Sequence, residues 1–247
     1  MQDRYVGDVG DFGKFALLRD LTRDRKLRLG VVWCHYPDEG HNGDGRHVSY
    51  LQKPSMASLD PELHSALNIL VANGRRSLHA IEQSGVLPLD TLFFRETLRP
   101  AYPEARSQLR LQHRASWLDR ALSTTAEADL VFFDPDNGLE TPSIGNSHPK
   151  AGKYIFWEEL VPFWQRGQSL VVYHHLNRTM SASEQTGRLY RDFSRRLANP
   201  ALVLPMTFRR GSCRHFWVVA QQRHAKALKK AATTFLARGW APHFDPL

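Results

Sequence analysis

Short apolar runs alternate along the chain with segments in which apolar residues recur at helical spacing. Continuous apolar runs of this length are typical of strands that are buried on both faces of a parallel sheet. They predict strands over residues 29–34, 91–95, 129–133 and 169–174. Helical spacing predicts helices over residues 8–24, 60–72, 76–83, 104–122, 154–166, 181–197 and 223–238.

The last two predicted strands, 202–208 and 214–220, are separated by a gap of hairpin length. Strands that alternate with helices indicate an α/β fold. We expect a Rossmann-like, mostly parallel sheet with helices on both faces and a C-terminal antiparallel β-hairpin. We also expect a single α/β domain over residues 1–247, with a helical insertion around 56–90.

The ends and faces of several helices can be predicted as well. Asp8 is a candidate N-cap of the first helix, and Ser181 with Glu184 forms a capping-box pattern at the start of another. In the helix over 104–122, the apolar stripe expected to face inward is Leu111, Ala115, Leu118 and Leu122. The basic residues on another face of that helix are Arg106, Arg110 and Arg114.

Composition and charge fit a globular protein that contacts a polyanion. The chain has 247 residues, of which 42% are hydrophobic, and a net charge of +8. Residues 161–247 alone carry 14 basic and 3 acidic side chains. Since Arg recognises phosphate with a planar bidentate group, this excess favours DNA or RNA as a partner, with a merely solvated basic surface as the alternative. The candidate phosphate contacts are Arg178, Arg188, Arg191, Arg195, Arg209 and Arg210.

The sequence indicates a cytoplasmic protein without a membrane segment. The first residues are charged from Asp3 onward and contain no apolar core of a signal peptide. The longest apolar runs are far shorter than the roughly 20 residues that a membrane span needs. Cys34 and Cys213 are isolated, which fits a reducing compartment and argues against a zinc ribbon.

Polar residues follow three of the predicted strands, where ligands bind in open α/β sheets. Residues 33–36 close the first strand, residues 134–137 follow the strand over 129–133, and His174 and His175 close the next one. Because neighbouring side chains on a strand point to opposite faces, only one of the two histidines can reach a given site. Among the aromatic residues, we expect Trp33 and Tyr36 to be available for base stacking at this edge, whereas the tryptophans at 157, 164, 217 and 240 belong to the core.

The pair Asp134-Pro135 is the strongest candidate for chemistry. Proline restricts the residue before it, so the Asp134 carboxylate is held in a defined conformation. Such a group can accept a hydrogen bond from an exocyclic amine or bind a metal, although a capping Asp in a turn is the simpler interpretation. The polar residues that surround it within seven positions are Asp136, Asn137 and Glu140.

The N-terminal sequence GDVGDFGK is the second unusual feature. Glycines in a helix interior are unfavourable by about 1 kcal/mol each, so Gly7, Gly10 and Gly13 indicate a close backbone approach or an irregular helix start. Asp8, Asp11 and Lys14 recur every three residues and would share one helix face, as a salt-bridge ladder or as part of a site. The segment lacks the pattern of a phosphate-binding loop, and the chain contains neither HExxH nor GxSxG.

These motifs resemble the class I S-adenosylmethionine-dependent methyltransferases. The resemblance rests on the helix with Asp11 and Lys14, on the strand that ends in DPDNGLE, and on the closing hairpin. It is nearest to bacterial rRNA adenine-N6 methyltransferases and to three-Cys-motif partner proteins. The chain is also similar to an uncharacterised bacterial family that shares GDxGDFGK, DPDNGLE and KYxxWEE, a likeness that covers most of its length.

The resemblance implies roles for individual residues. Asp134 would accept hydrogen bonds from the target amine, Pro135 would supply a backbone carbonyl, and His174 would lie at the same edge. Asp136 stands where the amino-methyltransferases have a second proline, and Asn137 where they have a stacking aromatic residue. No Gly-x-Gly turn follows the first strand. The residues implied in cofactor binding are Asp11, Lys14, Trp33, His35 and Asp44.

Three functions are compatible with these features. The leading hypothesis is an S-adenosylmethionine-dependent methyltransferase that acts on an amino group of a nucleic-acid base. The first alternative is a nuclease or phosphodiesterase dependent on Mg²⁺ or Mn²⁺, with Asp134, Asp136 and Glu140 as ligands. The second is a non-catalytic nucleic-acid-binding module.

Overall fold

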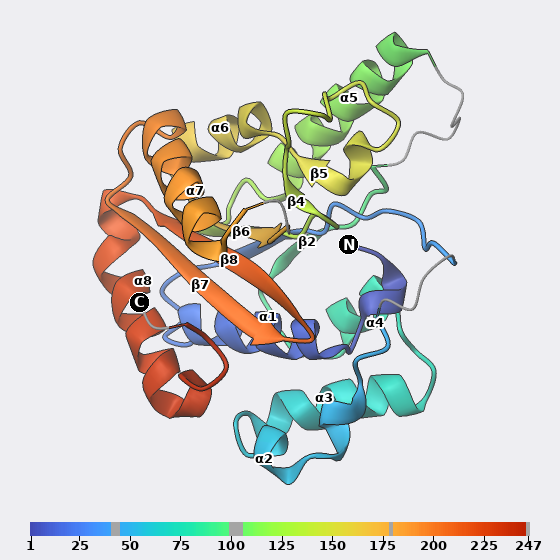
Figure 1. Cartoon of the computed structure of the whole chain (residues 1–247), viewed down its shortest axis with the longest axis vertical. Helices are drawn as coiled ribbons and strands as arrows, with labels where there is room; N and C mark the ends of the chain where they lie inside the picture. The colour runs from blue at the N-terminus through green and yellow to red at the C-terminus, as the bar shows by residue number, and fades with distance from the viewer. Residues whose placement is uncertain (41–44, 99–105, 178–179, 246–247) are drawn as a thin grey trace.

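The computed structural model describes residues 1–40, 45–98, 106–177 and 180–245, and it shows a six-stranded sheet between two layers of helices (Figure 1). The strand order is β2-β1-β3-β6-β8-β7. β1, β2, β3 and β6 pair in parallel, and β8 pairs antiparallel with both of its neighbours. The strands are β1 (Leu29–Val32), β2 (Leu92–Phe94), β3 (Leu130–Phe133), β6 (Ser169–His175), β7 (Leu202–Arg210) and β8 (Ser212–Ala220). The short strands β4 (Gly138–Leu139) and β5 (Tyr154–Ile155) form a separate pair.

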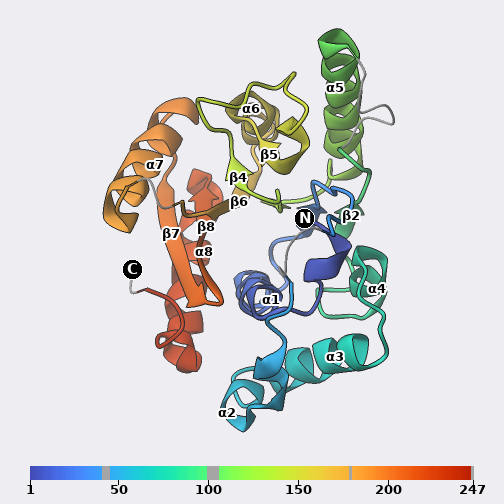
Figure 2. The same ribbon diagram turned by 45° about the vertical axis from the view of Figure 1, so that its right-hand side comes forward.

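Helices cover both faces of the sheet. One apolar core joins the sheet to α1 (Val9–Leu21), α3 (Pro61–Ala72), α4 (Leu78–Gln83) and α8 (Gln222–Phe235), with α2 (Pro54–Ala57) beside α3. A second core joins the opposite face to α5 (Ser107–Thr124), α6 (Trp157–Gln165) and α7 (Ala182–Arg196). The rotated view separates the two layers clearly (Figure 2). The α/β fold expected from the sequence is therefore confirmed.

The apolar strands belong to both cores because successive side chains point to opposite faces. In β3, Phe132 contributes to the core around α1, and Phe133 contributes to the core around α6. Both phenylalanines are fully buried. This two-sided burial is the physical reason why the strand sequences are continuous apolar runs.

The helix starts follow the predicted caps. Asp8 accepts a hydrogen bond from the Asp11 backbone N–H at 2.9 Å, and Ser181 Oγ accepts one from Glu184 N–H at 3.2 Å. The hairpin is tighter than expected, because β7 and β8 extend toward each other until only Gly211 separates them. Gly211 has a φ of +74°, which a residue without a side chain adopts most readily.

The predicted inward face of α5 is only partly correct: Leu118 and Leu122 pack against the second core, but Leu111 and Ala115 are exposed. Leu111 is 39% exposed, whereas Arg114 and Trp117 are buried. The Arg114 guanidinium forms a buried ion pair with Glu159 on α6 and also donates to the Ala151 and Tyr154 carbonyl oxygens. Glu159, 45 positions away in the sequence, thus allows Arg114 to lie on the buried face of α5.

Cys34 and Cys213 are not paired in a disulfide bond, and the described helices include no candidate membrane span. Both cysteines are free thiols. Burial raises the pKa of the Cys34 thiol to about 12, so this side chain is protonated at neutral pH. Within the described ranges, no helix has both the length and the apolar character needed to cross a bilayer.

Candidate functional site

The carboxyl ends of β1, β3 and β6 meet at one edge of the sheet, as their parallel pairing requires. A cavity of about 350 Å³ lies at this edge, beside the start of α1. Its walls come from α1, from the segment after β3, from the end of β6 and from the β7–β8 hairpin. The charged and polar side chains in the cavity lining include Asp8, Asp11, Lys14, Asp134, Asp136, Asn137, Tyr173, His175, Ser212 and Arg214.

Lys14 lies between two buried carboxylates. Its Nζ is 2.6 Å from Asp11 Oδ1 and 2.7 Å from Asp134 Oδ2. The three side chains are each at most 4% exposed. The GDVGDFGK and DPDN motifs, which are far apart in the sequence, therefore meet through one ammonium group.

Burial and charge act against each other in this cluster. Burial raises the pKa of Asp11 to about 6, even though the nearby Lys14 ammonium lowers it. Burial lowers the pKa of Lys14, but the attraction of Asp11 and Asp134 outweighs burial and raises it above its ordinary value. Lys14 is therefore a fixed cation at neutral pH.

The segment after Pro135 is held by residues from three other parts of the chain. Asp136 Oδ2 accepts a hydrogen bond from Gln2 Nε2 at 2.8 Å and lies 3.6 Å from Lys153 Nζ. The backbone N–H of Asn137 donates to the Lys153 carbonyl, and the Asn137 carbonyl accepts from the His175 N–H. Asp136 Oδ1 is buried, and no described residue provides a hydrogen bond to it. An acceptor of this kind is costly to leave unpaired in a closed protein interior.

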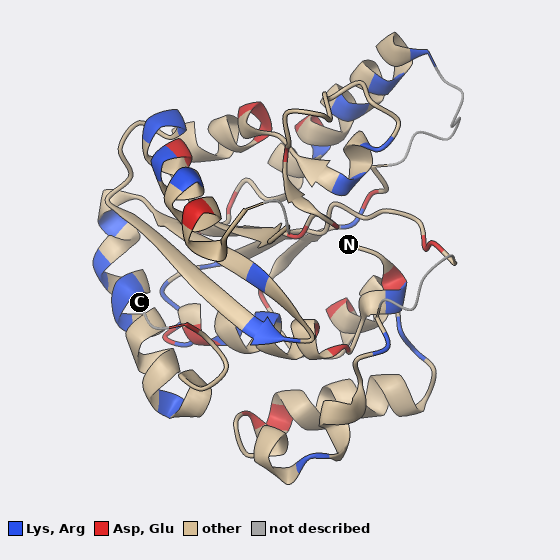
Figure 3. Cartoon of the chain, viewed as in Figure 1, with Lys and Arg blue, Asp and Glu red and all other residues tan. Residues whose placement is uncertain are grey.

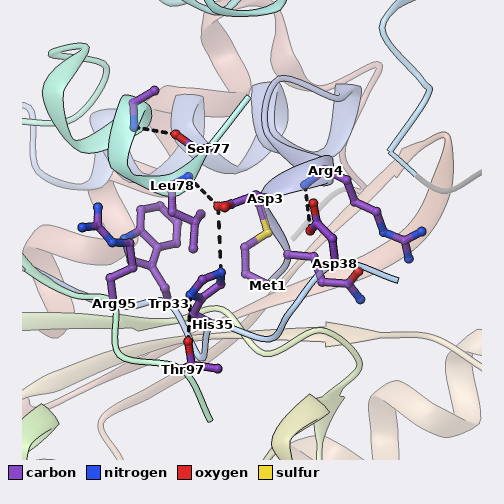
Figure 4. A network of polar contacts seen from close by, with 12 residues as sticks. Met1, Asp3, Arg4, Trp33, His35, Asp38, Ser77, Leu78, Arg95 and Thr97 are labelled. Carbon is purple, nitrogen blue, oxygen red and sulfur yellow. Dashed lines mark hydrogen bonds and ion pairs between the residues drawn. The ribbon is translucent and has the colours of Figure 1, made fainter. Parts of the chain in front are cut away.

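Trp33 and His35 do not line this cavity. Figure 4 shows His35 instead beside Asp3 and Thr97. Trp33 is fully buried and donates from Nε1 to Glu82 at 2.9 Å, so the expectation that it offers a stacking face is wrong. His35 lies between Asp3, 3.9 Å away, and the Thr97 hydroxyl at 3.4 Å. Tyr36 is 8% exposed and packs beneath the Lys153 ammonium.

The two histidines at the end of β6 point to opposite faces, as predicted. His175 lines the cavity with Asp134, whereas His174 lines a second cavity of about 530 Å³ between the segment after β4 and α7. His174 Nδ1 accepts a hydrogen bond from the Leu139 N–H at 3.1 Å. Burial lowers the pKa of His174 to about 3, so its ring is neutral at pH 7.

The ligand set of the metal alternative does not assemble. Glu140 lines the second cavity, away from Asp134 and Asp136. Asp134 is paired with Lys14 instead. In the part of the chain that the structure describes, no three His, Cys, Asp or Glu side chains are grouped so that they could hold a metal ion.

The candidate phosphate-binding arginines are spread over two elements (Figure 3). Arg188, Arg191 and Arg195 are exposed on α7, where Arg195 pairs with Asp192. Arg209 and Arg210 are exposed at the end of β7 and bond to Asp245 and His243. Asp44 and Arg178 lie outside the described residues.

Sequence reasoning missed Tyr173, Ser212 and Arg214 as part of the cavity. Tyr173 and His175 are two positions apart on β6, and Ser212 and Arg214 are two positions apart on β8. The strand period of two would have placed each pair on one face. The pairing of β6 with β8, which the sequence does not reveal, brings these faces together.

No protein-family model matches this chain, and searches of the curated proteins and of the solved structures find no match either. The function must therefore be argued from the geometry of the site.

Proposed function

We propose that this chain is an S-adenosylmethionine-dependent methyltransferase that acts on an amino group of a nucleic-acid base. The observation that carries the proposal is the buried Asp134 carboxylate, which lines a cavity at the carboxyl end of β3 and is fixed by Lys14. A fixed carboxylate can accept a hydrogen bond from an amine and stabilise the positive charge that develops on it. Asp134 would take this role, with Pro135 restricting its conformation.

The cavity fits a cationic cofactor. Its lining contains four carboxylates, Asp8, Asp11, Asp134 and Asp136, against the basic side chains of Lys14 and Arg214 and the Met1 ammonium group. The buried Asp136 Oδ1 lacks a partner among the described residues and supplies an acceptor for an ammonium or amine hydrogen. When bound, S-adenosylmethionine would supply the electrophilic methyl group.

The chain's own residues would position the amine and exclude water. Lys14 keeps Asp134 and Asp11 together in a region almost closed to solvent. In this setting, electrostatic interactions are stronger than at the surface. Asp134 would accept a hydrogen bond from one amine N–H, which leaves the single lone pair of the nitrogen free to attack. The proton that the methylated nitrogen then loses would pass to the Asp134 carboxylate or to water.

The exposed arginines support a nucleic-acid substrate. Arg209 and Arg210 lie directly before Gly211 and Ser212, which line the cavity. Phosphate groups bound there would be adjacent to the proposed reaction site. Such contacts position a nucleic acid without reading its sequence.

A transfer assay with isotopically labelled S-adenosylmethionine tests the proposal. The acceptors are pooled RNA and DNA, and the variants are Asp134→Asn and, as the matched control, Asp90→Asn at an exposed position. We expect wild-type and Asp90→Asn protein to transfer label and Asp134→Asn to be slower by about 10²-fold or more.

The proposal would be overturned if the wild-type protein transferred no label and calorimetry showed no binding of S-adenosylmethionine or S-adenosylhomocysteine. Nucleic-acid binding under those conditions would support the non-catalytic module. Nucleic-acid cleavage that required Mn²⁺ would support the nuclease alternative, even though Glu140 lies apart from Asp134 and Asp136 in the structure.

A further inference from the structure

Arg214 is a buried cation that the proposed transfer step does not use. It lies on β8 opposite His175 of β6, so its side chain shares a sheet face with Tyr173 and His175. The residue is only 9% exposed and lines the cavity that contains Asp134.

The hydrogen-bonding capacity of Arg214 is only partly used. Its Nη2 donates to Ser212 Oγ at 2.5 Å. Its Nε is buried and has no acceptor within the described parts of the chain. No Asp or Glu oxygen of those parts lies within 4.0 Å of the guanidinium. Asp8 comes close: a Cβ built on Gly10 would lie 1.4 Å from Arg214 Nη1 and 3.0 Å from Asp8 Oδ1, so this carboxylate lies just beyond ion-pair distance. Its Oδ1 already accepts the Asp11 N–H as the cap of α1.

The position of the guanidinium depends on Gly10. A Cβ atom at residue 10 would lie 1.4 Å from Arg214 Nη1 and 2.6 Å from its Cζ. The guanidinium therefore occupies the space that any other residue at this position of α1 would fill. This arrangement explains the second glycine of the GDVGDFGK motif.

The cavity is thus polarised. Asp134 and Asp136 contribute negative charge and a buried acceptor, whereas Arg214 contributes positive charge and a buried donor. A buried arginine without a carboxylate partner is unfavourable unless an anion pairs with it. Arg also forms its strongest hydrogen bonds with carboxylate and phosphate oxygens.

We propose that Arg214 and Ser212 form an oxyanion subsite of this cavity, which binds the carboxylate or phosphate of a ligand whose amino group lies toward Asp134 and Asp136. The proposal rests on the function proposed above and specifies the ligand of the same site. A carboxylate would belong to the amino-acid part of the cofactor, and a phosphate would belong to a nucleotide substrate.

Two pairs of ligands distinguish the sources. S-Adenosylhomocysteine and 5′-methylthioadenosine differ by the amino-acid head group, and AMP and adenosine differ by the phosphate. Inorganic phosphate serves as a probe that needs no adenosine pocket. Calorimetry is carried out on the full chain and on Arg214→Gln, Gly10→Ala and the control Arg120→Gln, which removes an exposed arginine of α5.

In at least one pair, we expect the wild-type protein and Arg120→Gln to bind the member that carries the carboxylate or phosphate about tenfold or more tightly than its partner. Arg214→Gln should remove this preference without changing the affinity for the neutral member. Gly10→Ala should have the same effect because it displaces the guanidinium but keeps its charge. Thermal melting of each variant verifies that it is folded, and either variant alone suffices for the test.

The outcome separates this proposal from the proposed methyl transfer. The subsite is wrong if no anionic ligand is preferred by the wild-type protein, or if the preference persists in folded Arg214→Gln. Labelled methyl transfer in that case would leave the proposed function intact. Conversely, Arg214-dependent binding of phosphate or AMP without any methyl transfer would establish the subsite and count against the methyltransferase.

Discussion

At the scale of single residues, the candidate site depends on Lys14. Its ammonium group is the only basic side chain of the described residues that lies within 4.0 Å of either Asp11 or Asp134. Without it, two buried carboxylates would share one region of low polarity. Removing one partner of a buried ion pair typically costs about 3–5 kcal/mol, because the remaining charge is left uncompensated.

Replacing Lys14 by Met should therefore lower the free energy of unfolding by about 3–5 kcal/mol at pH 7, as measured by urea denaturation. The double variant Asp11→Asn with Lys14→Met should recover part of this loss, because it removes one unpaired charge. Arg120→Met, which breaks an exposed pair with Glu96, is the control and should have a much smaller effect. Equal losses in Lys14→Met and Arg120→Met would contradict this description of the site.

The sequence predicts the chemistry of such residues better than their partners. The spacing of Asp11 and Lys14 predicts a shared helix face, and the DPDN turn predicts a fixed Asp134. Nothing local indicates that the two motifs meet, because their contact joins residues 120 positions apart. Trp33 shows the same limit, since the Glu82 carboxylate that accepts its indole N–H lies on α4.

At the scale of elements, the packing of α1 against the β7–β8 hairpin explains two glycines. A Cβ at residue 13 would lie 2.7 Å from the Phe208 ring, and Gly10 leaves room for Arg214. The sequence predicts a close backbone approach or an irregular helix start, whereas at Gly10 and Gly13 the approaching groups are the side chains of Arg214 and Phe208. The hairpin closes on α1 because β8 inserts between β6 and β7.

This packing reverses the usual effect of replacing glycine in a helix. Alanine normally stabilises a helix interior by about 1 kcal/mol relative to glycine. Gly13→Ala should instead destabilise the protein by about 1–3 kcal/mol, because the new methyl group overlaps Phe208. Gly187→Ala in α7 is the matched control, since its Cβ would meet only Arg191 Nη1 at 3.7 Å, and it should stabilise by about 1 kcal/mol. Urea denaturation of both variants measures the difference, and stabilisation by Gly13→Ala would refute the packing argument.

Element boundaries and types were predictable wherever the signal was local. Apolar runs, Asp8 and the Ser181 capping box locate strands and helix starts correctly. The inward face of α5 was predicted only in part: Leu118 and Leu122 face the core, but the Arg114–Glu159 pair also turns an arginine inward. A helix face can be assigned from periodicity only when its charged residues have no distant buried partner.

At the scale of the whole molecule, buried histidines should make the fold sensitive to acid. Burial lowers the pKa of His174 to about 3 and of His215 to about 4, from an ordinary value of 6.5. In the unfolded chain both rings bind a proton as the pH falls below 6.5, but in the folded chain they stay neutral. Their contribution to stability is therefore present above pH 6.5 and is lost as the pH falls. Asp11 acts in the opposite direction, because its raised pKa of about 6 favours the folded state at low pH and this contribution disappears as the pH rises.

Burial also lowers the pKa of His35, His224 and His243 and raises that of Glu140, so histidines with lowered pKa values outnumber carboxyl groups with raised ones. The free energy of unfolding should therefore fall by about 1–3 kcal/mol per pH unit between pH 6 and 4.5. Urea denaturation across this range measures the slope. His215→Gln should reduce it by about 1.4 kcal/mol per pH unit, which corresponds to one proton, whereas the exposed His79→Gln serves as the control. In the folded chain, the His215 ring is hydrogen-bonded to Thr186 and Thr207. If the slope of the free energy of unfolding against pH were unchanged in His215→Gln, the His215 ring would not remain neutral in this position.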